Sequence, residues 1–276
     1  MTNASLLTAS LLTAGLFPGL ASRSPRRAIL LGAGQGLRMR PLTDTTAKPL
    51  LTVGGQSLLD HALDRLAEAG IEQVVVNAHW HAAQIEQRLL ARAALRPGGP
   101  RTITLHEPAL LDTGGAVLAA LAAGLLDRAA PFFVVNGDSL WRDGPKPALA
   151  RLAGGFDPDR LDALLLVSRI AWAVGDVGRL DFAGDFALDP DGVVRRRREH
   201  EIVPYVYAGV QIVSPSLFDT IAEGAFSMNR LWDRAIRARR LRALVHDGPW
   251  FHLSRPADLI AAEAAMRDPM FGPSDT

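Results

Sequence analysis

The stretch Arg27-Ala-Ile-Leu-Leu-Gly-Ala-Gly-Gln-Gly36 joins a short apolar run to three glycines. Four apolar residues that end in glycines are typical of a buried parallel strand whose chain turns sharply at its carboxyl end. The backbone N–H groups at such a strand end can surround a phosphate. The stretch therefore predicts an α/β fold with an anion-binding loop after its first strand.

Downstream of this loop, strand-like and helix-like patterns alternate. Ser57, with Asp60 three residues later, predicts a helix start, and Gly70 predicts the end of that helix. This alternation predicts a doubly wound, mostly parallel, Rossmann-like sheet, with ligands beyond the carboxyl ends of its strands. Further strands are expected at 74–77, 102–105 and 132–136, and further helices at 82–91 and 115–126.

Beyond residue 161 the pattern changes to short β-like runs, and we expect this part to form the wall for a second substrate. No low-complexity linker separates the two parts, so we predict one domain over 27–268 with a β-rich sub-region. The expected strands are 164–168, 178–188, 193–198 and 205–213, with a turn at 189–192 and helices at 216–222, 229–239 and 256–266.

The first 26 residues are expected to form an extension, either disordered or packed as a short arm. Residues 1–21 are apolar and rich in Ser and Thr, and no charge precedes Arg23. A signal peptide would have a basic region before its apolar run. We therefore expect a cytoplasmic protein.

Composition excludes several classes of function. The 276 residues carry 30 Lys and Arg against 29 Asp and Glu, and this balance gives no field that would attract nucleic acid or a membrane surface. No run of 18 apolar residues occurs, so a membrane span is not expected. The absence of cysteine excludes disulfides, thiolate zinc sites and a cysteine nucleophile.

The glycine loop fits neither of two common phosphate-binding patterns. A dinucleotide fingerprint needs a third glycine where Leu37 stands and an acidic residue near Gly54 and Gly55. A P-loop would close with Gly-Lys-Ser/Thr, which is missing. What remains is a glycine loop followed by Arg38 and Lys48, two cations able to reach a polyphosphate. A tight turn with solvated arginines explains the loop alone equally well.

A wider resemblance makes the loop specific. Residues 31–43, LGAGQGLRMRPLT, and the following Lys48-Pro49-Leu50 resemble the signature of the sugar-nucleotide pyrophosphorylases. The resemblance covers about residues 27–266 and is greatest to the short bacterial N-acetylmuramate 1-phosphate uridylyltransferases, which act in peptidoglycan recycling. It continues through Asn77, 111–116, 135–138, 184–186, 207–210 and Trp250.

The resemblance implies that a sugar 1-phosphate oxygen attacks the α-phosphorus of a nucleoside triphosphate, with Mg²⁺ present and pyrophosphate leaving. Such a reaction needs positioning and charge neutralisation rather than a covalent intermediate. Residues 27–160 would form the nucleotide-binding half and 161–268 the sugar-phosphate half. The implied catalytic residues are Arg38, Lys48 and Asp138, with Asp138 as a Mg²⁺ ligand; the nucleotide-binding residues are Gly32, Ala33, Gly34, Gly36, Asn77, Glu107, Thr113 and Gly114; the sugar-phosphate-binding residues are Asn136, Gly184, Asp185, Glu199, Tyr207 and Gly209.

One position departs from the family pattern. Where these enzymes usually carry a second metal-binding Asp, the chain reads Trp250-Phe251-His252. Imidazole suits transition metals better than Mg²⁺. Three interpretations stay open: His252 binds a bridging water or phosphate, the enzyme prefers another metal, or its activity is weakened.

Two classes of function are compatible with these patterns. An enzyme would take a nucleoside triphosphate, with UTP preferred, and N-acetylmuramate 1-phosphate; guanylyl transfer to mannose 1-phosphate and thymidylyl transfer to glucose 1-phosphate are its rivals. A degenerate relative would instead bind a nucleotide-sugar as a regulatory subunit, but it would not need Arg38, Lys48 and Asp138 together. The sequence does not indicate an oligomeric state, and a monomer is compatible with it.

Overall fold

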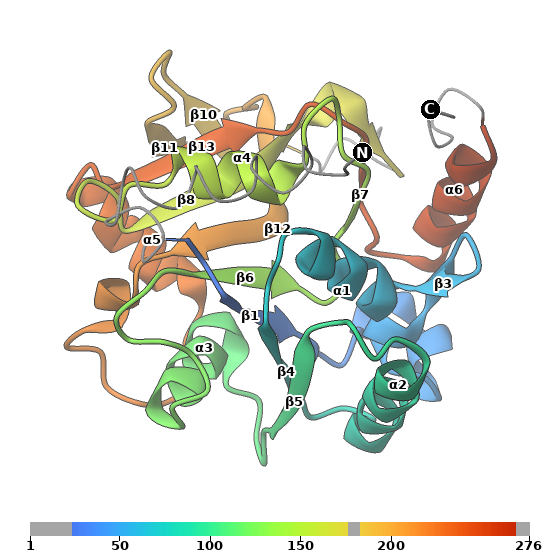
Figure 1. The fold of residues 1–276 in the computed structure, drawn as a ribbon. Helices are drawn as coiled ribbons and strands as arrows, with labels where there is room; N and C mark the ends of the chain where they lie inside the picture. The colour runs from blue at the N-terminus through green and yellow to red at the C-terminus, as the bar shows by residue number, and fades with distance from the viewer. Residues whose placement is uncertain (1–23, 176–182, 269–276) are drawn as a thin grey trace, which may run out of the picture.

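A computed structural model describes residues 24–175 and 183–268 of the chain. Most of the expected extension at 1–26 and the first part of the expected strand at 178–188 lie outside the described residues. The centre of the molecule is a nine-stranded sheet in the order β11-β10-β12-β6-β1-β4-β5, in which β8 pairs with β12 and β13 pairs with β8 (Figure 1). Its strands are β1 (Arg27–Leu31), β4 (Gln73–Ala78), β5 (Arg101–His106), β6 (Phe132–Asn136), β8 (Ala163–Arg169), β10 (Phe186–Leu188), β11 (Val194–Arg196), β12 (Tyr205–Val213) and β13 (Leu241–Val245).

Four parallel strands form the half of the sheet that carries the glycine loop. β1 pairs in parallel with both β4 and β6, and β4 pairs in parallel with β5. Leu31 stands in register with Asn77 on one side and Asn136 on the other. The loops after these strands therefore open at one edge of the sheet, and the predicted mostly parallel, doubly wound architecture is confirmed.

Strand β12 connects the two predicted halves. It runs antiparallel to β6 over residues 210–213 and antiparallel to β8 along most of its length. Its register against β8 shifts between Tyr207 and Gln211, and Gly209 stands inside this irregularity with φ +78°. One continuous sheet thus extends through both halves.

Helices cover both faces of the sheet because strand residues alternate between two apolar cores. Ala28 and Leu30 of β1 face one core, which α1, α2 and α4 complete, whereas Ile29 faces the other, which α3 and α5 complete. A third, smaller core joins α6 to the short strands at the margin near β3 (Figure 1). The helices are α1 (Leu58–Glu68), α2 (Ala82–Leu95), α3 (Asp112–Ala122), α4 (Ala148–Gly155), α5 (Met228–Arg237) and α6 (Pro256–Arg267); the short strands are β2 (Thr52–Val53), β3 (Gln56–Ser57), β7 (Leu140–Trp141), β9 (Ala173–Val174) and β14 (Trp250–Phe251).

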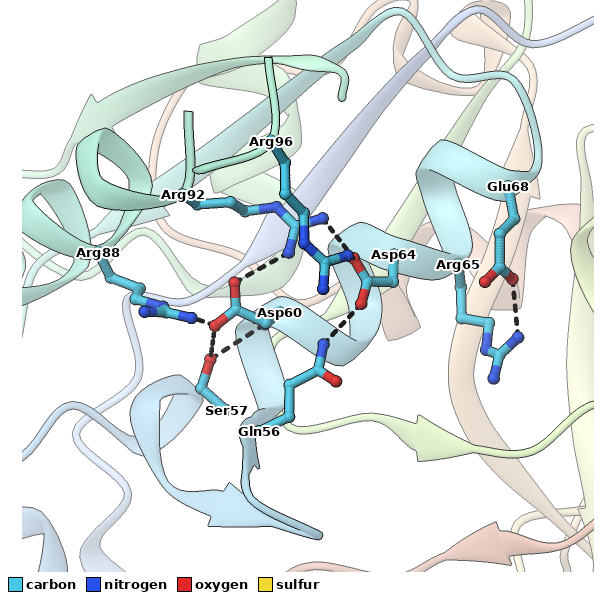
Figure 2. A network of polar contacts seen from close by, with 9 residues as sticks. All are labelled: Gln56, Ser57, Asp60, Asp64, Arg65, Glu68, Arg88, Arg92 and Arg96. Atoms are coloured by element: carbon cyan, nitrogen blue, oxygen red, sulfur yellow. Dashed lines mark hydrogen bonds and ion pairs between the residues drawn. The ribbon is translucent and has the colours of Figure 1, made fainter. Parts of the chain in front are cut away.

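Helices α1 and α2 share a buried network of charges (Figure 2). Asp60, 1% exposed, accepts hydrogen bonds from Arg88 (2.6 Å) and Arg92 (3.0 Å) of α2. Burial raises the pKa of Asp60, but the hydrogen bonds from Ser57, Arg88 and Arg92 outweigh it and hold the pKa below its ordinary value. Ser57 also accepts the Asp60 backbone N–H, as its predicted role of N-cap requires.

Several predicted element boundaries were wrong, among them those of two helices. The helix expected at 115–126 begins at Asp112 and ends at Ala122, so residues 113 and 114 belong to its first turn. The helix expected at 216–222 is only a 3₁₀ turn at 215–218, because the chain leaves helical geometry before Thr220, whose φ is +66°. No helix among residues 24–175 and 183–268 has the length and apolar character that a bilayer crossing requires.

Candidate functional site

The backbone conformation of the glycine loop after β1 depends on Gly36 and Thr43. Gly36 has φ +63°, and a Cβ at this position would lie 2.9 Å from Thr43 and 3.2 Å from the Lys48 Cβ. The Thr43 hydroxyl donates to the Gly36 carbonyl (2.9 Å) and fixes the returning chain against the loop. Among the described residues, the backbone N–H groups of Gly34, Gln35 and Gly36 have no hydrogen-bond partner. They are donors that a bound anion could use.

Two predicted catalytic residues from distant parts of the chain are in contact. Lys48 Nζ donates to Asp138 Oδ2 at 2.5 Å, and their side chains are 13% and 38% exposed. Asp138 follows β6, where the Gly137 N–H donates to the Leu31 carbonyl (2.8 Å) and fixes the loop beside β1. The glycine loop and the loop after β6 therefore meet in one cation–carboxylate pair.

Two adjoining cavities lie at this site. These loops enclose the one of about 660 Å³, which we name the larger cavity of the two. Most of the predicted catalytic and nucleotide-binding residues line it, and the side chain of Arg38 is exposed at this wall. Its lining is Leu31, Gly32, Ala33, Gly34, Gln35, Gly36, Leu37, Arg38, Lys48, Pro49, Asn77, Glu107, Leu110, Asp112, Thr113, Asn136, Gly137, Asp138 and Ser254.

Asn77 and Glu107 line the larger cavity but also bind its backbone. The Gly32 N–H donates to Asn77 Oδ1 (2.8 Å), and Asn77 Nδ2 donates to Glu107 Oε1 (2.7 Å). The other carboxylate oxygen of Glu107 accepts the Leu111 N–H (3.1 Å). Both side chains are buried. This relay ties together the ends of β1, β4 and β5, so both residues shape the cavity through the backbone.

Thr113 and Gly114 differ in position, although both were predicted to bind the nucleotide. Thr113 lines the larger cavity, and its hydroxyl accepts the Met228 N–H (2.9 Å). The Gly114 N–H instead donates to the Phe226 carbonyl (2.8 Å), and a Cβ on Gly114 would lie 2.3 Å from the Phe226 ring. The group that approaches Gly114 closely is therefore Phe226, and Gly114 does not belong to the cavity wall.

A second cavity of about 240 Å³, the smaller cavity, adjoins the first. The two share Leu31, Asp112, Thr113 and Asn136, and the smaller one contains the predicted residues Asn136, Asp185 and Tyr207. Its lining is Leu31, Asp112, Thr113, Asn136, Asp185, Phe186, Arg196, Tyr207, Gln211, Ser227, Met228, Asn229 and Trp232.

Tyr207 carries a polar group that the fold leaves poorly satisfied. Its hydroxyl is buried and makes no well-formed hydrogen bond with the described residues, although the Gln211 side chain lies close enough to affect it. Burial raises the pKa of Tyr207 far above its ordinary value, Gln211 lowers it in part, and the charge of Asp138 raises it further. The hydroxyl is therefore a neutral donor beside the smaller cavity.

The remaining residues predicted to bind the sugar phosphate, Gly184, Glu199 and Gly209, line neither cavity. A Cβ on Gly209 would lie 1.9 Å from Ser139 Oγ, so Gly209 lets β12 approach the loop that carries Asp138. Gly184 has φ +73° just before β10 and lines neither cavity. Glu199 lies beyond β11 with its side chain 90% exposed, and it too is absent from both walls.

His252 follows β14, and the charges of Lys48 and Asp138 act on it. Burial lowers its pKa; Asp258 and Asp138 act to raise it, and Arg38 and Lys48 act to lower it. Asp258 accepts the Ser254 and Arg255 N–H groups (2.8 and 2.7 Å), which fixes the start of α6 next to His252. Within the described part of the chain, no group of three or more His, Cys, Asp or Glu could hold a metal.

Several cavity residues were not predicted from the sequence, and two of them show why. Asp112 lines both cavities with φ +57°, and it stands inside the quoted segment 111–116, so the segment itself pointed to it. Ser254 lines the larger cavity where the sequence departs from the family pattern, so no motif indicated it.

Comparisons with known proteins indicate the family to which the chain is similar. Residues 27–155 match the family model described as nucleotidyl transferase. The chain is 38% identical over 248 residues, 90% of this chain and 99% of the relative, to N-acetylmuramate alpha-1-phosphate uridylyltransferase of Caulobacter vibrioides. It is 35% identical over 240 residues, 86% and 97%, to the protein of the same name from Neisseria meningitidis serogroup B.

A solved structure supports the fold. That of UDP-glucose pyrophosphorylase complexed with UDP-glucose superposes with a TM-score of 0.70 at 16% identity, and the match covers 87% of this chain and 98% of that chain.

Proposed function

The chain belongs to the nucleotidyl transferase family of sugar-1-phosphate nucleotidyltransferases, and we propose that it transfers the uridylyl group of UTP to N-acetylmuramate 1-phosphate and releases pyrophosphate. The single observation that carries this proposal is the Lys48–Asp138 contact in the wall of the larger cavity, which shares four lining residues with the smaller cavity. A triphosphate and a sugar phosphate placed in them would meet at this pair. A role in peptidoglycan recycling in the cytoplasm follows from the choice of acceptor.

The residues supply what in-line phosphoryl transfer needs. The free N–H groups of residues 34–36 would hold the triphosphate, and Arg38 and Lys48 would neutralise the charge that develops on the leaving pyrophosphate. Lys48 is largely buried, so its charge acts with little screening by water. Asn77 and Glu107 keep the loop in the geometry in which these donors converge.

Mg²⁺ fits the donors that the chain offers. Asp138 is a partly exposed carboxylate in the wall of the larger cavity, and its charge acts on His252. Mg²⁺ is usually bound by one or two carboxylates together with waters and substrate phosphates, so a closed cluster of protein ligands is not required. When bound at Asp138, the ion would supply further charge neutralisation for the phosphates of both substrates.

A pyrophosphate-release screen tests the proposal. Four nucleoside triphosphates are combined with N-acetylmuramate, N-acetylglucosamine, glucose and mannose 1-phosphates in Mg²⁺, and again in EDTA. We expect selectivity for UTP with N-acetylmuramate 1-phosphate and loss of release in EDTA. Preference for GTP with mannose 1-phosphate, or for dTTP with glucose 1-phosphate, would contradict the proposed pair of substrates. Binding of nucleotide-sugar without release from any pair would favour a regulatory protein.

A further inference from the structure

The smaller cavity has one positively charged side chain among its described lining residues, Arg196 of β11. Val194 and Arg196 lie on one face of this short strand, and Arg195 lies on the other. Both terminal nitrogens of Arg195 donate hydrogen bonds to the Glu201 carboxylate (2.8 and 2.6 Å), away from the cavity. Neighbouring arginines of one basic run therefore have different surroundings, and only Arg196 faces the cavity.

Arg196 is fixed in place without being fully engaged. Its Nε donates to Asp233 Oδ1 (2.9 Å) and its Nη2 to the Asn229 carbonyl (3.3 Å). The guanidinium carbon lies 5.2 Å from the Phe186 ring centre and 5.6 Å from that of Trp232. Among the described residues, its Nη1 has no hydrogen-bond partner. An immobilised guanidinium with free N–H groups is preorganised to bind a carboxylate.

Among the described residues, neither acidic side chain of the same wall forms an ion pair with Arg196. Asp185 Oδ2 accepts the Tyr207 N–H (2.8 Å), and Asp112 Oδ1 accepts the Thr113 N–H (2.5 Å). Asp233, the ion-pair partner of Arg196, is about half exposed, so solvent weakens its hold on the cation. The cavity therefore keeps an accessible positive group at Arg196.

We propose that Arg196 binds the carboxylate of an acidic sugar 1-phosphate and thereby selects N-acetylmuramate over N-acetylglucosamine. These two sugars differ by the lactyl ether of the former, whose carboxylate is the added group. The inference rests on the proposed function, because it takes the smaller cavity as the site of the sugar. Arg196 would recognise the substrate away from the reacting phosphates, so it would affect binding more than the chemical step.

Arg196→Gln tests this role. We expect KM for N-acetylmuramate 1-phosphate to rise about 10- to 100-fold, as for loss of one charged hydrogen bond, with kcat within about threefold. The KM, or the inhibition constant, of N-acetylglucosamine 1-phosphate should stay within about twofold. Arg195→Gln is the matched control and should leave both constants unchanged. Arg196→Lys should recover part of the loss, because it restores the charge without the planar guanidinium.

A substrate change tests the same contact in the unaltered protein. N-acetylmuramate 1-phosphate with its carboxylate converted to a carboxamide should lose about as much kcat/KM as Arg196→Gln causes, and the two changes together should not add. Equal losses for the acidic and the neutral sugar, no loss in Arg196→Gln, or additive losses would overturn the inference. If the unaltered protein does not use N-acetylmuramate 1-phosphate, the proposed function itself fails. The loss of kcat/KM on the carboxamide is measured in the unaltered protein, so this part of the test stands even if Arg196→Gln fails to fold, and Arg196→Lys then serves as the variant for the test of additivity.

Discussion

At the scale of single residues, Lys48 is the cation most closely tied to the proposed chemistry. We expect Lys48→Ala to lose on the order of 10²-fold or more in turnover, because it removes one preorganised donor from the site. Lys146 is exposed and is the only other lysine in the chain, so Lys146→Ala is the control. Pyrophosphate release by both variants gives the comparison. Near-normal turnover in Lys48→Ala would remove Lys48 from the mechanism.

His252 is the second residue whose role can be measured directly. Its lowered pKa keeps it neutral at pH 7, beside Arg38, Lys48 and Asp138. A carboxylate is a better ligand for Mg²⁺ than imidazole, so His252→Asp should lower the Mg²⁺ concentration that gives half-maximal activity, by about threefold or more. Titrations with Mg²⁺ and Mn²⁺ on the natural protein and the variant provide the values. If neither rate nor metal preference changes, His252 has no part in catalysis.

At the scale of elements, the irregular part of β12 positions the loop that carries Asp138. Gly209→Ala would place a Cβ 1.9 Å from Ser139 Oγ, so we expect turnover to fall on the order of 10²-fold as that loop moves. Gly55 has nearly the same φ, +76°, but no atom within 4 Å of the added Cβ. Gly55→Ala should therefore cost about 1–2 kcal/mol of stability and leave turnover unchanged. Equal turnover in the two variants would show that Gly209 does not act through Ser139.

The α1–α2 network predicts a large loss of stability from one change. Asp60→Ala leaves the buried Arg92 without one of its carboxylate partners, so we expect the free energy of unfolding to fall by about 3–5 kcal/mol. Glu68 pairs with Arg65 at the surface, and Glu68→Ala should change stability by less than about 1 kcal/mol. Urea titrations measure both. A loss in Asp60→Ala no larger than that in Glu68→Ala would contradict the assignment of the network to stability.

The elements that the sequence predicted well are those with a strong local pattern. The apolar runs gave β1, β6 and β12 with almost their full bounds, because a buried strand must be apolar along its length. The strands β7, β9 and β14 were missed, since each has only two residues and forms only by pairing with a segment that is distant in the sequence. The first turn of α3 was missed for another reason. Gly114 is required by the approach of Phe226 and Gly115 by that of the Gly224 carbonyl, but glycine in a sequence suggests a turn.

At the scale of the whole molecule, stability should depend on pH through groups with lowered pKa. Burial lowers the pKa of His246, although the Arg142 and Pro249 carbonyls and the Asp143 and Asp247 charges oppose this. Below pH 6.5 the unfolded chain takes up a proton that folded His246 does not, so stability falls by at most about 1.4 kcal/mol per pH unit from this residue.

Further losses should follow from other groups. His252 acts in the same direction as His246, and below pH 4 the lowered pKa values of Asp60 and Asp64 add a second loss as the unfolded carboxylates are protonated first. Urea titrations at pH 7, 6, 5 and 4 measure this dependence. His246→Gln should have a smaller slope between pH 7 and 5, and His200→Gln, whose parent side chain is 91% exposed, is the control. The same slope in both variants would contradict the role of His246.

The parts of the candidate site that lie in segments with a recognisable sequence signature could be predicted. The parts that depend on packing between distant segments of the chain could not. The glycine loop, Lys48 and Asp138 come from segments with their own sequence signature, and the structure brings them together. Glu199 was predicted from sequence position, but it lies on an exposed loop away from both cavities. Arg196 was not distinguished from its basic neighbours, because its orientation depends on the rings of Phe186 and Trp232.

The double pairing of β12 has a consequence for how the gene could be divided. A cut between residues 160 and 161 would give one fragment with β1, β4, β5 and β6 and another with β8 and β12. The first fragment would expose the edge of β6 that β12 covers, and unpaired edges promote aggregation. Each fragment produced alone should therefore be insoluble. Coexpression should reconstitute pyrophosphate release, and such a split pair would serve as a reporter for proteins fused to its two ends.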